Sequence, residues 1–177
     1  MSMFCYQCQE TAGNKGCTVK GVCGKKPETA NLQDLLIWLT KGISFLEQKT
    51  GGDREVDVFI IENLFSTITN ANFNADWFEN RIDSALKTRD KIKSEYKSLT
   101  EEEKVENLPE PTRWTPKSAE EIYEKAEEIG VLVFEGFHDR LAARLPGVAQ
   151  IVVIRLAGTV FTAQDAAHVA VPGVGND

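Results

Sequence analysis

Four cysteines near the N-terminus are the feature that most constrains what this chain can fold into. Cys5, Cys8, Cys17 and Cys23 are separated by two, eight and five residues, and the 177-residue sequence holds no other cysteine. The surrounding segment, residues 1–28, carries several glycines and lacks the apolar periodicity of a helix or a strand. We therefore expect a loop that folds around a bound metal group.

The spacing of these thiols favours an iron–sulfur cluster. A four-iron cubane takes four thiolates from a chain that wraps it closely, with glycine turns that direct backbone amides at the sulfurs. Structural zinc sites more often use two Cys-X-X-Cys pairs, or one pair with two histidines. Only Cys5 and Cys8 form such a pair here. On spacing alone, zinc is the second interpretation and disulfides are the third.

Polar side chains lie between the cysteines and are candidates to donate hydrogen bonds to the cluster sulfurs. We expect most of them only to anchor the loop to the rest of the protein. The candidates are Gln7, Gln9, Glu10, Thr11, Thr18 and Lys20.

Composition and charge narrow the class of partner. A net charge of −7 with 42% hydrophobic residues suits a globular protein and argues against a nucleic-acid or anionic-membrane partner. The first twenty residues do not resemble a signal peptide, and no apolar run reaches transmembrane length. We expect a cytoplasmic protein, and in that compartment clustered thiols stay reduced and available to a metal.

Residues 29–99 predict three amphipathic helices joined by short connections. The first is expected over 32–48 with Asn31 as its cap, and Asp53 is expected to cap the second. An Asn cluster over residues 70–74 predicts the turn into the third helix. Such a pattern is typical of an antiparallel three-helix bundle in an all-α fold. The expected core faces include Leu35, Leu39, Phe59, Leu64, Ile82 and Leu86, with Ile68 at the end of the second face.

The remainder divides into an acidic linker over 100–116, a fourth helix over 117–130 and an irregular, divergent tail over 131–177. Thr115 and Pro116 predict the start of the fourth helix. Every lysine lies at or before Lys125, and the tail uses arginine alone as its cation. This change favours a tail of different origin, frameshifted or fused. Its two histidines, His138 and His168, have no cysteine left to join them at a metal.

Part of the sequence resembles a known family. The run FCYQCQETAGNKGCTVKGVCGKKPETANLQDLLIWLTKGI is similar to the opening of hybrid cluster proteins, also called prismane proteins or hydroxylamine reductases. The similarity continues through LFSTITNANF to EKAEEIGVL, which ends at residue 132. The resemblance therefore covers about three quarters of the chain, in its N-terminal [4Fe–4S] region only.

The resemblance implies that Cys5, Cys8, Cys17 and Cys23 hold a [4Fe–4S] cluster. In that family the cubane passes electrons from an electron-donor protein to a separate hybrid cluster, where hydroxylamine is reduced to ammonia. Members are much longer, and this chain has no cysteine left for the hybrid cluster, so we assign no catalytic residue. The missing catalytic domains are a further expected partner. The alternatives are a small non-enzymatic electron carrier and a zinc-stapled interaction module.

Overall fold

A computed structural model describes residues 2–68, 71–99 and 107–142, and for 131–142 it describes the backbone alone. The helices are α1 (Pro27–Thr50), α2 (Arg54–Ser66), α3 (Ala75–Leu99) and α5 (Ala119–Ala142). Two 3-10 turns, η1 (Ala12–Asn14) and η2 (Glu110–Thr112), accompany them. The described residues contain no β-strand, only an isolated bridge between Cys5 and Cys17. The predicted all-α class is confirmed.

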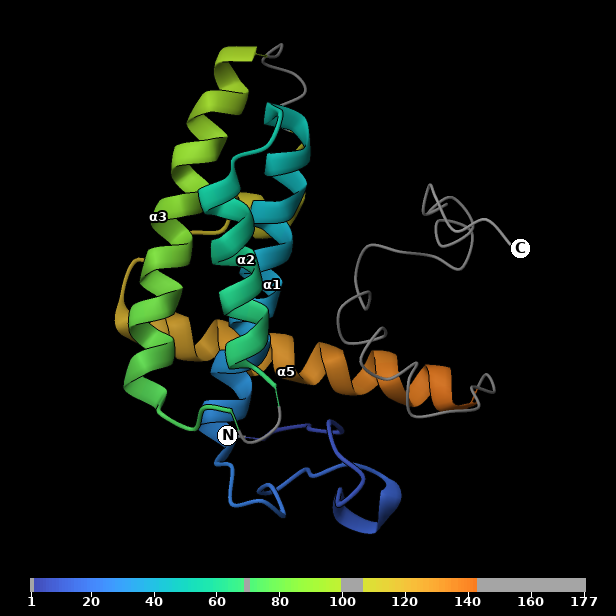
Figure 1. The fold of residues 1–177 in the computed structure, drawn as a ribbon. Helices are drawn as coiled ribbons and strands as arrows, with labels where there is room; N and C mark the ends of the chain where they lie inside the picture. The colour runs from blue at the N-terminus through green and yellow to red at the C-terminus, as the bar shows by residue number, and fades with distance from the viewer. Residues whose placement is uncertain (1, 69–70, 100–106, 143–177) are drawn as a thin grey trace, which may run out of the picture.

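Helices α1, α2 and α3 run up, down and up beside one another, and α5 lies across them near one end (Figure 1). α1 is the central helix, since it packs against α2, α3, α5 and η2. The cysteine-rich loop lies at the same end of the bundle as the start of α1 (Figure 1). The bundle therefore presents one end to the loop that carries all four thiols.

The ends of the helices follow local capping chemistry. α1 begins at Pro27, so the predicted start at Leu32 with Asn31 as cap is wrong. Proline suits the first helical position because its fixed φ and missing N–H cost nothing there. The predicted cap of α2 is confirmed, since the Asp53 side chain accepts from the N–H of Glu55 at 2.8 Å. Gly51, with φ of 102°, ends α1 in the left-handed conformation that glycine tolerates.

The apolar core lies between α1, α3 and α5. Leu35, Leu39 and Ile82 are fully buried and Leu86 nearly so, as predicted. On α2, Phe59 is only partly buried and packs against the core, and Leu64 is half-buried. Ile68 is 53% exposed, so its predicted place on the buried face is wrong. Its position lies beyond the end of α2, where the helical spacing no longer holds.

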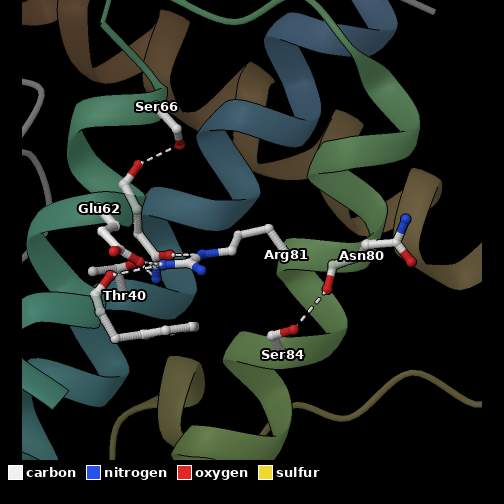
Figure 2. Close-up of polar contacts among 8 residues, drawn as sticks. Thr40, Glu62, Ser66, Asn80, Arg81 and Ser84 are labelled. Atoms are coloured by element: carbon white, nitrogen blue, oxygen red, sulfur yellow. Dashed lines mark hydrogen bonds and ion pairs between the residues drawn. The ribbon is translucent and has the colours of Figure 1, made fainter. Parts of the chain in front are cut away.

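A buried polar cluster joins the three helices of the bundle (Figure 2). Asn63 of α2 is fully buried and donates from Nδ2 to Thr40 Oγ1 of α1 at 3.1 Å. Its Oδ1 accepts from Arg81 Nε of α3, and Arg81 also bonds the Glu62 carboxylate at 2.8 Å. These bonds satisfy both ends of the buried amide, which is otherwise costly to desolvate. The cluster therefore fixes α2 against α1 and α3.

Part of the predicted linker is packed structure. η2 lies against α1, where a Cβ on Gly42 would come within 2.7 Å of the Pro111 backbone. The fully buried Arg89 of α3 donates to the carbonyl oxygen of Trp114 and, at 3.2 Å, to Thr115 Oγ1. The ring of Trp114 meets Trp38 edge to face, with centroids 6.0 Å apart. Residues 100–106 of the predicted linker lie outside the described part.

The fourth helix of the sequence prediction, expected over 117–130, corresponds to α5 and differs from it at both ends. α5 begins at Ala119, where Ser118 Oγ accepts from the N–H of Glu121 at 3.4 Å. Thr115 and Pro116 therefore precede the helix and do not start it. The helix continues to Ala142, so the backbone does not become irregular at residue 131 as predicted. Residues 143–177 of the predicted tail lie outside the described part.

Candidate metal centre

The cysteine loop is organised around one pairing of backbones. Cys5 and Cys17 form an antiparallel bridge, in which the Cys5 N–H donates to Cys17 O at 3.0 Å and the Cys17 N–H to Cys5 O at 2.9 Å. This pairing brings together the backbones of two cysteines that are far apart in the loop. Both are buried, in a small apolar cluster with Met3 and Ala30.

The other two cysteines lie nearer the surface. Cys8 is half-buried and Cys23 is exposed, and all four thiols are free. Among the described residues, no three His, Cys, Asp or Glu side chains come together in a group that would hold a single metal ion. The structure therefore pairs Cys5 with Cys17 and does not gather the four predicted residues into one ion's coordination sphere.

Cys17 has the surroundings of a thiolate. Burial raises the pKa of Cys17, but hydrogen bonds from the backbones of Ala12 and Val22 outweigh it, and the net pKa lies below the usual value. The Thr11 hydroxyl, 3.7 Å from Cys17 Sγ, and the charge of Lys25 lower the pKa further. Backbone amides directed at a sulfur are what an iron–sulfur loop requires, so the donor set at Cys17 fits that chemistry.

Two glycines allow the loop to close tightly. Gly16 has φ of 115°, and a Cβ there would come within 2.2 Å of the Phe4 ring. Gly21 lies against the turn that carries Cys23, where a Cβ would come within 3.0 Å of Cys23 Sγ. Side chains at these positions would displace an aromatic ring in one case and a candidate ligand in the other.

Polar side chains hold the loop together and tie it to the bundle. Thr11 Oγ1 donates to Cys5 O at 3.1 Å, and Gln7 Nε2 donates to the carbonyl oxygen of Thr67 at 2.9 Å. Gln7 thus anchors the loop, as expected for most polar residues between the cysteines. At the start of the chain, Asn31 Nδ2 donates to Ser2 O at 2.8 Å, so residues on both sides of Cys5 are held.

The sequence analysis missed Lys25, which is almost fully buried beneath this loop. Its Nζ donates to Gln33 Oε1 of α1 at 2.7 Å and to Gln7 Oε1 at 3.2 Å. The sequence could have drawn attention to a lysine near Cys23, but Lys25 and Lys26 both follow that cysteine closely. Nothing in the sequence distinguishes the buried lysine from the exposed one.

The family model for the Prismane/CO dehydrogenase family matches residues 3–169. The chain belongs to this family. Curated relatives named hydroxylamine reductase are 49% identical in Halothermothrix orenii, over 75% of the chain, and 50% in Thermoanaerobacter pseudethanolicus, also over 75%. The relative in Nitratidesulfovibrio vulgaris is 42% identical over 93% of the chain. The chain covers 25%, 24% and 30% of these three relatives, so it spans about a quarter of their length.

The family model extends the resemblance beyond its predicted end, whereas the Halothermothrix and Thermoanaerobacter relatives cover the predicted three quarters of the chain. The sequence analysis ended the similarity at residue 132, whereas the family model continues to residue 169 and the Nitratidesulfovibrio relative covers 93% of the chain. None of the described helices is long and apolar enough to cross a membrane.

Proposed function

We propose that this chain is the electron-relay part of a protein like hydroxylamine reductase, with Cys5, Cys8, Cys17 and Cys23 as ligands of a [4Fe–4S] cluster. The observation that carries the proposal is the paired, buried Cys5 and Cys17 in a member of this family, with backbone hydrogen bonds directed at Cys17 Sγ. Such a cluster, once bound, passes single electrons. Family membership favours it over the zinc-stapled alternative.

The chain's own residues have distinct parts in this proposal. Cys5 and Cys17 hold the buried side of the group and exclude water there, since both are nearly inaccessible. Cys8 and Cys23 hold the side that faces solvent, where an electron-donor protein would approach. Val19 and Val22 precede Cys23 in the sequence and are 81% and 61% exposed, so they offer an apolar contact surface.

A second surface suits the catalytic part of a full-length relative. Val58, Ile61 and Phe65 recur on one face of α2 and are 44%, 65% and 68% exposed, with Ile68 following at 53%. An apolar stripe of this kind marks an interaction surface. We propose as its occupant the part of the protein that corresponds to the unmatched three quarters of the relatives, because the chain spans only about a quarter of their length.

Anaerobic reconstitution with iron and sulfide tests the cluster. We expect four irons and four sulfides per chain, visible charge-transfer absorption and a paramagnetic signal after one-electron reduction. Two irons per chain would contradict the cubane, and zinc without sulfide would favour the zinc-stapled module. A cytoplasmic location remains a prediction, and it suits the proposal because a reducing compartment keeps the thiols available.

The small electron carrier remains the second candidate function, because an intact cubane is all that such a carrier needs. Mixing the reconstituted chain with the unmatched part of a relative distinguishes the two candidates. Electron transfer from the reduced chain to that part supports the relay, whereas transfer only to unrelated acceptors supports the carrier.

A further inference from the structure

Lys25 is buried at the junction between the cysteine loop and the helical bundle. Its side chain is 1% exposed, and its Nζ lies 5.9 Å from the centre of the Phe73 ring. Lysine is almost never fully buried unless its charge is held by partners, since desolvation of an ammonium costs several kcal/mol. Neighbouring groups must therefore stabilise the buried ammonium of Lys25.

Two glutamines hold the ammonium. Lys25 Nζ donates to Gln33 Oε1 at 2.7 Å and to Gln7 Oε1 at 3.2 Å. Each amide is oriented by its other end, because Gln7 Nε2 donates to Thr67 O at 2.9 Å and Gln33 Nε2 to Asn72 O at 3.0 Å. With both nitrogens committed to the backbone, both oxygens face the lysine. The two glutamine oxygens are neutral acceptors that hold the ammonium in place.

The same lysine is part of the loop that carries the thiols. It follows Cys23 by two residues, and its carbonyl oxygen accepts from the N–H of Gly21 at 2.8 Å, which closes the turn around Cys23. Its partner Gln7 is the neighbour of Cys8. Lys25 therefore links the segment around Cys8 to the segment around Cys23. Its contact with Gln33 of α1 places the ammonium on the side of the loop that faces the bundle.

We propose that Lys25 is a positioning residue that raises the reduction potential of the cluster by keeping one positive charge against its buried side. The proposal rests on the iron–sulfur assignment above. The electron comes from the donor protein, and it adds negative charge to a group that four thiolates already make negative. In a site of low dielectric, a fixed cation stabilises the reduced form more than the oxidised form. Net charge and hydrogen bonding are established determinants of cluster potential.

Equilibrium redox titration of the reconstituted chain tests the role of Lys25, with the signal of the reduced cluster as readout. Lys25→Met should lower the equilibrium constant for reduction at least tenfold, which is about 59 mV for one electron. Lys25→Arg should recover most of the loss because it keeps the charge. Lys26→Met is the matched control, since Lys26 is adjacent, carries the same charge and is exposed, and it should change the constant less than twofold.

A second variant covers the case in which Lys25→Met does not hold a cluster. Gln33→Glu leaves the lysine in place and puts a carboxylate against it, so it should also lower the constant at least tenfold. An intact cluster in Lys25→Met with the potential of the unaltered chain would overturn the role of Lys25. Where Lys25→Met binds no cluster, an unchanged potential in Gln33→Glu would overturn it instead. Either result would leave the cluster assignment standing. An unaltered chain that takes up no iron and sulfide would overturn the cluster assignment, and this proposal with it.

Discussion

Cys5 and Cys17 face each other across a single antiparallel bridge, with backbone hydrogen bonds of 3.0 and 2.9 Å in both directions. The bridge closes a loop that contains Cys8, since eleven residues, 6–16, lie between Cys5 and Cys17. Two segments with little apolar content of their own are thereby held together. The predictions for the loop follow from this pairing.

Cys17→Ser should abolish cluster binding and loosen residues 2–26, because it removes the proposed ligand, the thiol on which the hydrogen bonds from Ala12 and Val22 converge. Iron and sulfide analysis and hydrogen exchange of the loop would measure both effects. Val22→Ser is the control, because Val22 is exposed and next to Cys23 but has no thiol. A visible spectrum in Cys17→Ser equal to that of the unaltered chain would contradict the ligand assignment.

The metal-free chain should become more stable as the pH rises towards the ordinary pKa of a thiol, about 8.5. The folded pKa of Cys17 lies below its usual value, so its thiolate favours the fold. This contribution is fully present above the unfolded pKa and is lost as the pH falls through the folded pKa. Urea unfolding across this range would measure it. Cys17→Ser should remove this part of the pH dependence, and an identical slope in both chains would contradict the assignment.

Leu39→Ala should lower the free energy of unfolding by about 2 to 5 kcal/mol, the usual cost of a cavity at a fully buried leucine. Denaturant unfolding of the metal-free chain would measure this without interference from the cluster. Ile61→Ala is the control, since Ile61 is 65% exposed and its loss should cost less than about 0.5 kcal/mol. Equal effects at the two positions would show that the register of α1 is wrong.

The helices that local signals specify could be predicted from the sequence. Apolar spacing gave the buried faces of α1 and α3, and Asp53 gave the start of α2, because capping and periodicity depend on residues that are close in sequence. The start of α1 was placed too late, since Asn31 resembled a cap while Pro27 was the better signal. The side chain of Asn31 instead serves a distant partner, Ser2.

The sequence names the cysteines of the candidate site, and their role as ligands stays a prediction. Thiol spacing identified the cysteines, but the position of Lys25 depends on Gln33, and Gln33 is oriented by Asn72, which is 39 residues away. Likewise, the packing of residues 110–115 depends on Arg89 of α3, so an acidic, proline-bearing segment that suggested a linker is partly fixed. Contacts of this range leave no periodic signal in the sequence.

The exposed face of α2 should affect docking and leave stability unchanged. Phe65→Ser, at a side chain that is 68% exposed, should change the free energy of unfolding by less than about 0.5 kcal/mol. It should weaken binding to the unmatched part of the Halothermothrix orenii relative at least tenfold, as measured by calorimetry. Lys87→Ser, at an exposed position on α3, is the control and should bind normally. Unchanged binding by Phe65→Ser would show that another surface docks.

The 177-residue chain by itself should have no hydroxylamine reductase activity, even with its cubane intact and reduced viologen as donor. Reduction of an N–O bond needs an open metal site where substrate binds and where several electrons and protons are delivered. A cubane with four protein thiolates is coordinatively closed, so Cys5, Cys8, Cys17 and Cys23 would leave substrate no position on it. The sequence has no further cysteine for a second centre, and no group of three or more His, Cys, Asp or Glu side chains that could hold a metal ion is assembled in residues 2–68, 71–99 and 107–130. Turnover should appear only when the unmatched part of a relative is added and α2 docks against it. Viologen oxidation by the isolated chain that depends on hydroxylamine and disappears in Cys5→Ser would make the cubane itself the reactive centre.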